Sequence, residues 1–126
     1  MALAEYLQDH PKVERVYYPG LKDNEYHSTA RRLLGGRAYG GVLSFKVKGS
    51  EKEALEVLRS VEIIKPSPSL GGVESLLNYP LTSAAKTLSP AVRKELGIGD
   101  NLLRLAIGLE DIEDLKEDLS QALAKI

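Results

Sequence analysis

The sequence has no cysteine and no tryptophan, and its 126 residues include one methionine, one phenylalanine and two histidines. Without cysteine the chain can form no disulfide, no thiolate metal site and no cysteine nucleophile. His10 and His27 stand far apart, and neither is accompanied by a second histidine or a paired carboxylate at metal-ligand spacing. The sequence therefore indicates neither a metal centre nor cysteine chemistry.

The chain also lacks an excess of charge of either sign, since its formal net charge is −1. Nothing in this balance attracts nucleic acid or an anionic membrane. Arg31, Arg32 and Arg37 form a small basic group without accompanying aromatic residues, which is typical of a solvated helix face. No apolar run is long enough to span a bilayer, and the N-terminus lacks the pattern of a signal peptide. We expect a soluble cytoplasmic protein with neither nucleic acid nor membrane as a partner.

Length and residue pattern predict a single domain over residues 1–126 that mixes strands with helices. Strands are often separated by single helices, which favours the α+β class: a small antiparallel sheet with helices mainly on one face. The expected helices cover residues 2–9, about 24–34, the segment after the Ser50–Glu53 capping box, 89–97 and the C-terminus from about 111. The expected strands cover residues 13–18, 42–48, 62–65, 74–78 and the segment around Arg104.

Acidic residues crowd the start of the expected C-terminal helix. We expect Glu110, Asp111, Glu113 and Asp114 in its first turn, where the helix macrodipole favours negative charge. We therefore interpret all four as residues that stabilise the N-terminal end of this helix.

Arg104 interrupts a segment that otherwise has the composition of a buried strand. Alternation places Leu103 and Leu105 on one face and Arg104 on the other, between Leu102 and Ala106. A guanidinium cannot lose its charge there and is costly to desolvate without a partner. Its planar donors suit a carboxylate or phosphate. Alternatively, Arg104 pairs with a carboxylate of its own domain, or lies at a sheet edge with its stem along apolar surface.

A second segment suggests where a ligand could approach. Ser69 is followed closely by the pair Gly71-Gly72, where the backbone can turn sharply and come close to a bound molecule. With Arg104, this segment forms a candidate half-site for a small anion.

These segments resemble a known family. Ser-Leu-Gly-Gly-Val-Glu-Ser-Leu at 69–76, Leu-Gly-Ile at 96–98 and Leu-Arg-Leu-Ala-Ile-Gly-Leu-Glu-Asp at 103–111 are similar to the C-terminal domain of the pyridoxal-phosphate enzymes of Cys/Met metabolism. Cystathionine γ-synthase, γ-lyase and β-lyase belong to that family. The resemblance continues through His10-Pro11-Lys12-Val13 and Gly40-Gly41-Val42-Leu43-Ser44-Phe45, so it covers essentially the whole chain in order.

The resemblance implies the small domain of the aspartate-aminotransferase-like fold. It implies that Arg104 binds the α-carboxylate of an amino-acid substrate and that Ser69 lines the active site near the cofactor-bearing lysine. For Glu74, a packing or hydrogen-bonding role and a catalytic role both stay open. By the same resemblance, the Schiff-base lysine and the groups that hold pyridoxal phosphate belong to a large domain that would precede this sequence.

We therefore expect that this chain contains no catalytic residue and that alone it binds no cofactor and is inactive. It would work only when joined or docked to a pyridoxal-phosphate domain, which lies either upstream in the same chain or on a separate chain. The alternative is a free-standing interaction or assembly module derived from that domain. The surface that packs on the large domain, including Leu70, Leu76 and Leu77, would then be exposed and would favour a homo-oligomer.

Two departures from the family pattern bear on the type of reaction. Pro68 stands where many relatives have an acidic residue before the serine. Leu81-Thr82-Ser83-Ala84-Ala85 stands where many have a Met-Thr-His triplet. The choice among γ-synthase, γ-lyase and related activities therefore stays open.

Overall fold

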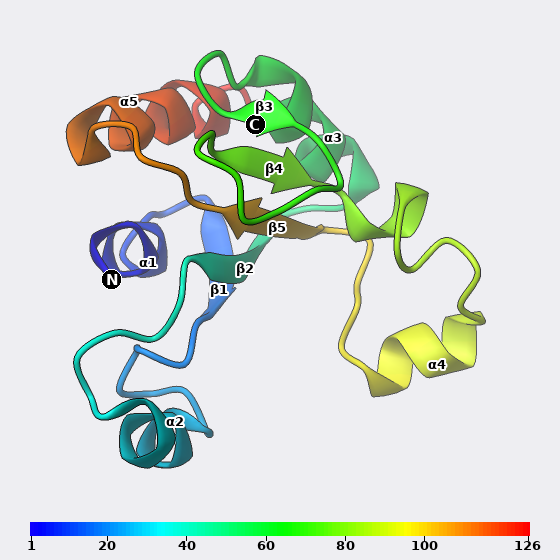
Figure 1. Cartoon of the computed structure of the whole chain (residues 1–126). Coiled ribbons are helices and arrows are strands. Elements are labelled where there is room, and N and C mark those ends of the chain that lie inside the picture. Colours follow the sequence, from blue (N-terminus) through cyan, green and yellow to red (C-terminus); the bar gives the residue numbers. More distant parts are fainter.

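The computed structural model describes residues 1–126 and shows a five-stranded sheet. Its spatial order is β1-β2-β5-β4-β3, so that β5 is the middle strand (Figure 1). The strands span Val13–Tyr17 (β1), Val42–Val47 (β2), Lys65–Pro66 (β3), Leu76–Asn78 (β4) and Leu102–Ala106 (β5). Neighbouring strands are antiparallel, as expected, with one exception: the short β3 runs parallel to β4.

Three of the five α-helices pack on the sheet or on one another, which confirms the expected α+β architecture. They are α1 (Ala2–Gln8), α3 (Glu51–Ser60) and α5 (Ile112–Leu123). Two further helices, α2 (His27–Leu34) and α4 (Pro90–Glu95), extend away from the sheet (Figure 1). A 3-10 turn, η1 (Pro80–Thr82), follows β4. None of these helices combines the length and apolar character needed to cross a membrane.

Local sequence signals place several helix ends where expected. The Ser50–Glu53 capping box opens α3, and the Ser89 hydroxyl caps α4 ahead of Pro90. Gly35 ends α2 with φ +71°, a left-handed conformation that glycine adopts without a steric penalty. The helix α2 begins later than predicted, at His27, because the Asn24 side chain accepts a hydrogen bond from the Tyr26 N–H in a turn before it.

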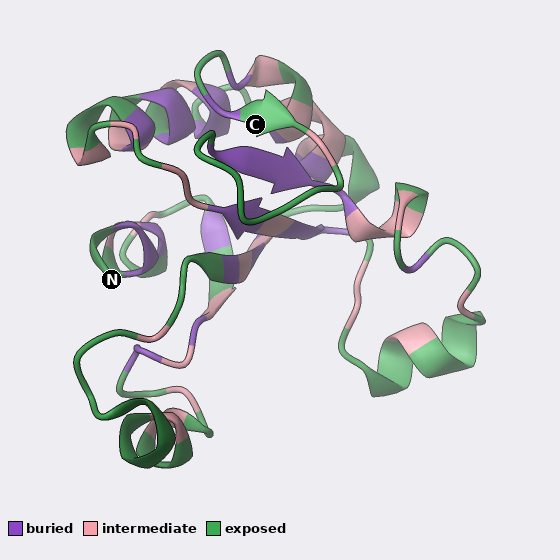
Figure 2. Ribbon diagram, viewed as in Figure 1, coloured by how far each residue is buried: buried purple, intermediate pink, exposed green.

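The core lies between the sheet and the three packed helices. The strand residues Leu43, Phe45, Leu103 and Leu105 are all buried, as their alternation predicts. Figure 2 shows this buried band through β4, β5 and the inner sides of the packed helices, whereas α2 and α4 are largely exposed. The helix residues that complete the core are Leu3, Leu7, Ala54, Val57, Leu115, Leu119, Ala122 and Leu123.

The expected strand at 62–65 is wrong except at Lys65, and a buried carboxylate explains the difference. Asp118 of α5 accepts hydrogen bonds from the N–H groups of Glu62 (2.7 Å), Ile63 (3.0 Å) and Ile64 (2.8 Å). These donors are therefore not available to a neighbouring strand. Pairing begins only at Lys65, so Asp118 sets where the chain enters β3.

The expected exposure of Leu76 and Leu77 is also wrong. Leu77 is fully buried in the core, and Leu76 is buried on the opposite face, paired with Ala106. Leu77 belongs to the core cluster between the sheet and the helices, and Leu76 is only 4% exposed, so neither leucine is available to a partner. Leu70, in the loop before β4, is exposed as expected.

Replacing Asp118 by Asn should destabilise the fold by about 2–3 kcal/mol, because one carboxylate oxygen becomes an N–H₂ group that faces backbone donors. Urea unfolding of the purified chain measures this change. Glu117→Gln is the matched control, since it makes the same chemical change at an exposed neighbour on α5 and should stay within about 0.5 kcal/mol. An equal loss in both variants would contradict the role assigned to Asp118.

Candidate substrate-carboxylate site

Arg104 lies on the middle strand of the sheet, on the face opposite the helical core. Its Nη2 atom donates hydrogen bonds to the carbonyl oxygens of Pro68 (2.7 Å) and Ser69 (2.8 Å). It makes no ion pair, since the one salt bridge of the structure joins Lys116 to Glu113. The alternative interpretations of Arg104, an internal ion pair or an edge position, are therefore wrong. The structure instead brings Arg104 together with Ser69.

The Nε atom of Arg104 is buried and has no hydrogen-bond partner. A buried polar group without a partner is uncommon in folded proteins, and the cost is higher for a group that carries charge. In the row across the sheet, Arg104 lies between Ser44 of β2 and Asn78 of β4, which are neutral. The guanidinium thus keeps a buried donor without a partner and an unbalanced positive charge.

Ser69 is exposed, and its contact with Arg104 is made by the main chain. Its N–H donates to the Ser67 hydroxyl (3.2 Å), and its own hydroxyl is not engaged by any protein group. Two residues further on, Gly71 has φ +79°, and a Cβ there would meet no atom within 4 Å. The loop therefore has an unengaged hydroxyl at Ser69 and open space at Gly71, two residues further on.

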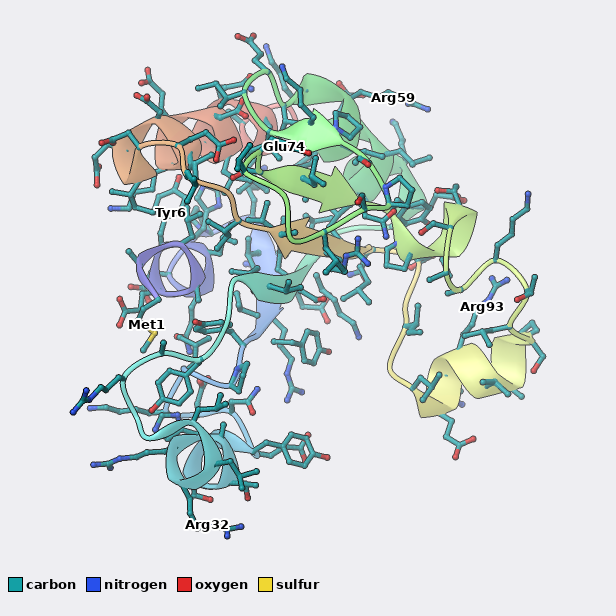
Figure 3. All side chains as sticks on the ribbon, viewed as in Figure 1. Met1, Tyr6, Arg32, Arg59, Glu74 and Arg93 are labelled. Carbon is teal, nitrogen blue, oxygen red and sulfur yellow. The ribbon has the colours of Figure 1, made fainter.

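Glu74 is exposed beside the start of β4 (Figure 3) and makes no hydrogen bond with the protein. Its nearest constraint is Gly72, where a Cβ would come within 2.9 Å of the Glu74 carboxylate. Glu74 therefore has no hydrogen-bonding role within this chain. Whether it has a packing role or a catalytic role stays open.

Glu110 has a role that the sequence analysis missed. Its carboxylate accepts hydrogen bonds from the N–H (2.7 Å) and the hydroxyl (2.8 Å) of Ser75, which is fully buried. It does not lie in the first turn of α5, because Asp111 is the N-cap; Glu113 and Asp114 occupy that turn as expected. A serine in a strand-like segment and a glutamate 35 residues later give no local signal of this pairing. It also explains why β4 begins at Leu76, two residues later than predicted.

The Ser75 contacts shift the titration of Glu110. Partial burial by itself would raise the pKa of this carboxyl, but the two hydrogen bonds from Ser75 favour the ionised form and hold the pKa below its usual value. Glu110 is therefore charged in the folded protein at neutral pH.

Residues from both departures from the family pattern, Pro68 and the segment 81–85, line one cleft. A hollow of about 230 Å³ beside β4 is lined by residues that include Pro68, Asn78, Thr82 and Ser83. The Ser83 hydroxyl donates to the Asn78 side-chain oxygen (2.9 Å), which fixes the orientation of that amide. Asn78 is in turn the β4 neighbour of Arg104, so the cleft adjoins the arginine site.

Other basic residues do not join this site. Arg93 of α4 turns toward the preceding loop (Figure 3), where it donates to the carbonyl oxygens of Leu88 and Lys86. Arg32 points away from the rest of the molecule on α2 (Figure 3), and Arg31 and Arg37 are exposed as well. The expected solvated basic face is thus confirmed.

Comparison with known proteins gives a match along nearly the whole chain. The model of the family described as Cys/Met metabolism PLP-dependent enzyme matches residues 1–124. The chain is 44% identical over 124 residues to a cystathionine gamma-lyase of Dictyostelium discoideum, covering 98% of this chain and 32% of that protein. It is 40% identical over 126 residues to an O-succinylhomoserine sulfhydrylase of Pseudomonas aeruginosa, covering 100% of this chain and 31% of that protein. The chain thus spans about a third of the length of these relatives.

A solved structure agrees with the fold. The crystal structure of cystathionine gamma synthase from Xanthomonas oryzae, in complex with aminoacrylate and cysteine, is similar with a TM-score of 0.90 and 36% sequence identity. The similarity covers 98% of this chain and 32% of that one. The expected pyridoxal-phosphate-enzyme fold of this segment is confirmed.

The lowered pKa of Glu110 predicts a specific acid sensitivity. A carboxyl whose pKa is depressed by folding adds stability above its unfolded pKa, about 4.3, and that stability is lost as the pH falls through the folded value. Thermal unfolding should therefore show that Glu110→Gln is less stable than the parent chain near pH 6 and that the gap narrows toward pH 3. Glu53, whose pKa the Ser50 hydrogen bonds also lower, titrates in the same window and cancels in the comparison. A gap independent of pH would contradict this interpretation.

Proposed function

Because the chain belongs to the family of PLP-dependent enzymes of Cys/Met metabolism, we propose that it supplies the substrate-carboxylate side of such an active site. The enzyme would be of the cystathionine γ-synthase or γ-lyase type. Arg104 would bind the α-carboxylate of the amino-acid substrate, and Ser69 would line the site beside it.

The unpartnered Nε atom of Arg104 carries this proposal. Nη2 is already satisfied by the carbonyl oxygens of Pro68 and Ser69, which fix the plane of the guanidinium. A carboxylate that accepts a hydrogen bond from Nε would supply both the absent partner and the absent negative charge. A neutral ligand would supply only the first, so an anion fits the site better.

The residues of this chain suit the substrate better than the cofactor. Arg104, Ser69 and Asn78 offer a guanidinium, a hydroxyl and an amide, and none of them is an amine that could form a Schiff base with pyridoxal phosphate. In the family, that cofactor provides the electron sink for chemistry at the amino-acid carbon. We therefore propose that another domain, in cis or as a separate chain, holds the cofactor, and that this chain alone is inactive.

The cleft beside β4 is the proposed determinant of which reaction is favoured. It is polar but uncharged at Asn78, Thr82 and Ser83, and Pro68 is among the residues that line it. A substrate side chain lying there would meet hydroxyl and amide groups rather than an acid. Because no acidic residue lines the cleft, it favours a substrate whose side chain carries no positive charge there.

An assembly role is the second candidate, and exposed apolar side chains favour it. Leu70, Val73 and Leu109 are 54%, 69% and 82% exposed. Val73 and Leu109 are adjacent, because the Leu109 N–H donates to the Val73 carbonyl oxygen (2.8 Å). In the complete enzyme this patch would contact the cofactor domain, whereas a free-standing module would use it to bind a second copy.

Arg104→Ala, tested after the chain is joined to a cofactor-bearing domain of the family, should lower kcat/KM roughly 10- to 150-fold. This loss corresponds to the about 1.5–3 kcal/mol of a hydrogen bond to a charged group. Steady-state kinetics with an amino-acid substrate measure it, and the same substrate with an amide in place of the α-carboxylate should show little difference between the two enzymes.

Arg59→Ala is the matched control, since Arg59 is exposed on α3, a helix of the opposite face of the sheet (Figure 3). It should leave kcat/KM unchanged. If Arg104→Ala retained full activity in the joined enzyme, the proposed carboxylate role would be wrong.

For the isolated chain, light scattering should detect a dimer or higher oligomer as concentration rises, because the apolar patch has no cover. Val73→Ser with Leu109→Ser should shift the chain toward the monomer. A strictly monomeric parent chain at high concentration would argue against the assembly role.

A further inference from the structure

The loop between β3 and β4, residues 67–75, is tied to the β5 side of the sheet at both of its ends. Near its start, the carbonyl oxygens of Pro68 and Ser69 accept hydrogen bonds from Arg104. At its end, Ser75 donates to Glu110. Figure 1 shows this loop crossing β5 between the two attachments. Arg104 and Glu110 are only six positions apart, so one short stretch of chain holds both ends of the loop.

The attachment at Ser75 is a closed arrangement of hydrogen bonds, which we term the Ser75 clasp. The Ser75 hydroxyl donates to Glu110 Oε2 (2.8 Å) and accepts from the Gly108 N–H (2.9 Å), while the Ser75 N–H donates to Glu110 Oε1 (2.7 Å). The Leu109 N–H donates to the Val73 carbonyl oxygen (2.8 Å). A carboxylate that accepts two hydrogen bonds from one buried residue defines position and direction together.

Gly108 shows how closely the two segments approach. A Cβ at this position would collide with the carbonyl oxygen of Val73 and the backbone of Glu74. Glycine is therefore required by the close approach of the loop. The end of the loop has no freedom to shift while the clasp is intact, because backbone lies directly against backbone.

We propose that Glu110 is a positioning residue of the candidate site, which acts through Ser75 to keep the loop on the guanidinium of Arg104. The loop has no regular structure of its own, and several of its residues are exposed. Without Glu110, the end of the loop would keep only its contacts with the Gly108 and Leu109 N–H groups. Its start would be held by Arg104 and by the Ser67 N–H, which donates to the Leu77 carbonyl oxygen (3.0 Å). The guanidinium would then lose the fixed orientation that directs its Nε atom. The importance of this orientation for substrate rests on the proposed function, whereas the link between Glu110 and the loop does not.

The experiment uses the isolated, 15N-labelled chain. Backbone relaxation reports the motion of residues 69–73, and the Nε–Hε signal of Arg104 reports the environment of the guanidinium. In Glu110→Ala, the order parameters of the loop should fall from about 0.85 toward 0.6 or below, and the Arg104 signal should shift. Glu110→Gln, which keeps one acceptor, should give a smaller change in the same direction. Ser75→Ala removes the hydroxyl but keeps the N–H that donates to Glu110 Oε1, so it should also give a partial change.

Glu113→Gln is the matched control, because it removes an exposed carboxylate three positions away that contacts only Lys116. It should leave both readouts unchanged. The amide signals of Phe45 and Leu103 report the core and should keep their positions in every variant. The proposal would be overturned if the loop and Arg104 responded no more to Glu110→Ala than to Glu113→Gln. It would equally be overturned if core and loop loosened together, since that would show general destabilisation.

These readouts are independent of catalysis. A loosened loop in Glu110→Ala together with full activity of Arg104→Ala in the joined enzyme would reject the proposed function and leave the positioning role in place. The reverse combination would reject the positioning role alone.

Discussion

The guanidinium of Arg104 on the middle strand is the constraint around which this face of the sheet is arranged. A charge on a central strand cannot reach solvent as easily as one at an edge, so it needs partners that come to it. The protein supplies two carbonyl oxygens from the loop after β3, and these satisfy one nitrogen of the guanidinium. The buried Nε is left without a hydrogen-bond partner, and this observation supports the proposed carboxylate role of Arg104.

Two carboxylates shape the chain that reaches Arg104. Asp118 collects three backbone N–H groups before β3, and Glu110 collects the N–H and hydroxyl of Ser75 before β4. Each replaces strand pairing with charge-assisted hydrogen bonds, which are stronger than those between neutral groups. As a result both strands are short, and the connection between them is a loop that crosses β5. The same carboxylate hydrogen bonds therefore both shorten the strands and fix the connection between them.

This arrangement agrees with a segment that completes a site rather than forming one alone. The family match and the fold similarity cover nearly the whole chain but only about a third of the relatives' length. A guanidinium, a free hydroxyl and a polar cleft are the groups that the proposed function assigns to substrate recognition. The exposed patch of Leu70, Val73 and Leu109 lies on the same loop and at the end of β5, so the candidate site and the apolar surface are neighbours. Binding of substrate and contact with another domain would thus occur side by side.

Local pattern in the sequence was enough for the elements whose signals are local. The alternation in β2 and β5 predicted which faces are buried, and capping residues such as Ser50 and Ser89 predicted helix starts. The sequence also singled out Arg104 and Ser69, because a charged residue in an apolar strand and a glycine pair after a serine are visible without the fold. Resemblance to the family, carried by the same segments, gave the fold class and the expected carboxylate role.

Tertiary structure alone decided what depends on partners distant in the chain. Asp118 lies more than 50 positions from the backbone groups it binds, and Glu110 lies 35 positions from Ser75. The helix and strand periodicities of the sequence do not reveal such pairs. For this reason β3 and β4 were predicted too long, and Glu110 was assigned to a helix end. Leu76 and Leu77 were misjudged for a related reason: the burial of a strand residue depends on what covers its face of the sheet, which segments distant in the sequence decide. The sequence by itself singled out Arg104 and Ser69, the residues proposed to bind and line an anion site, whereas the long-range hydrogen bonds decided how they are held together.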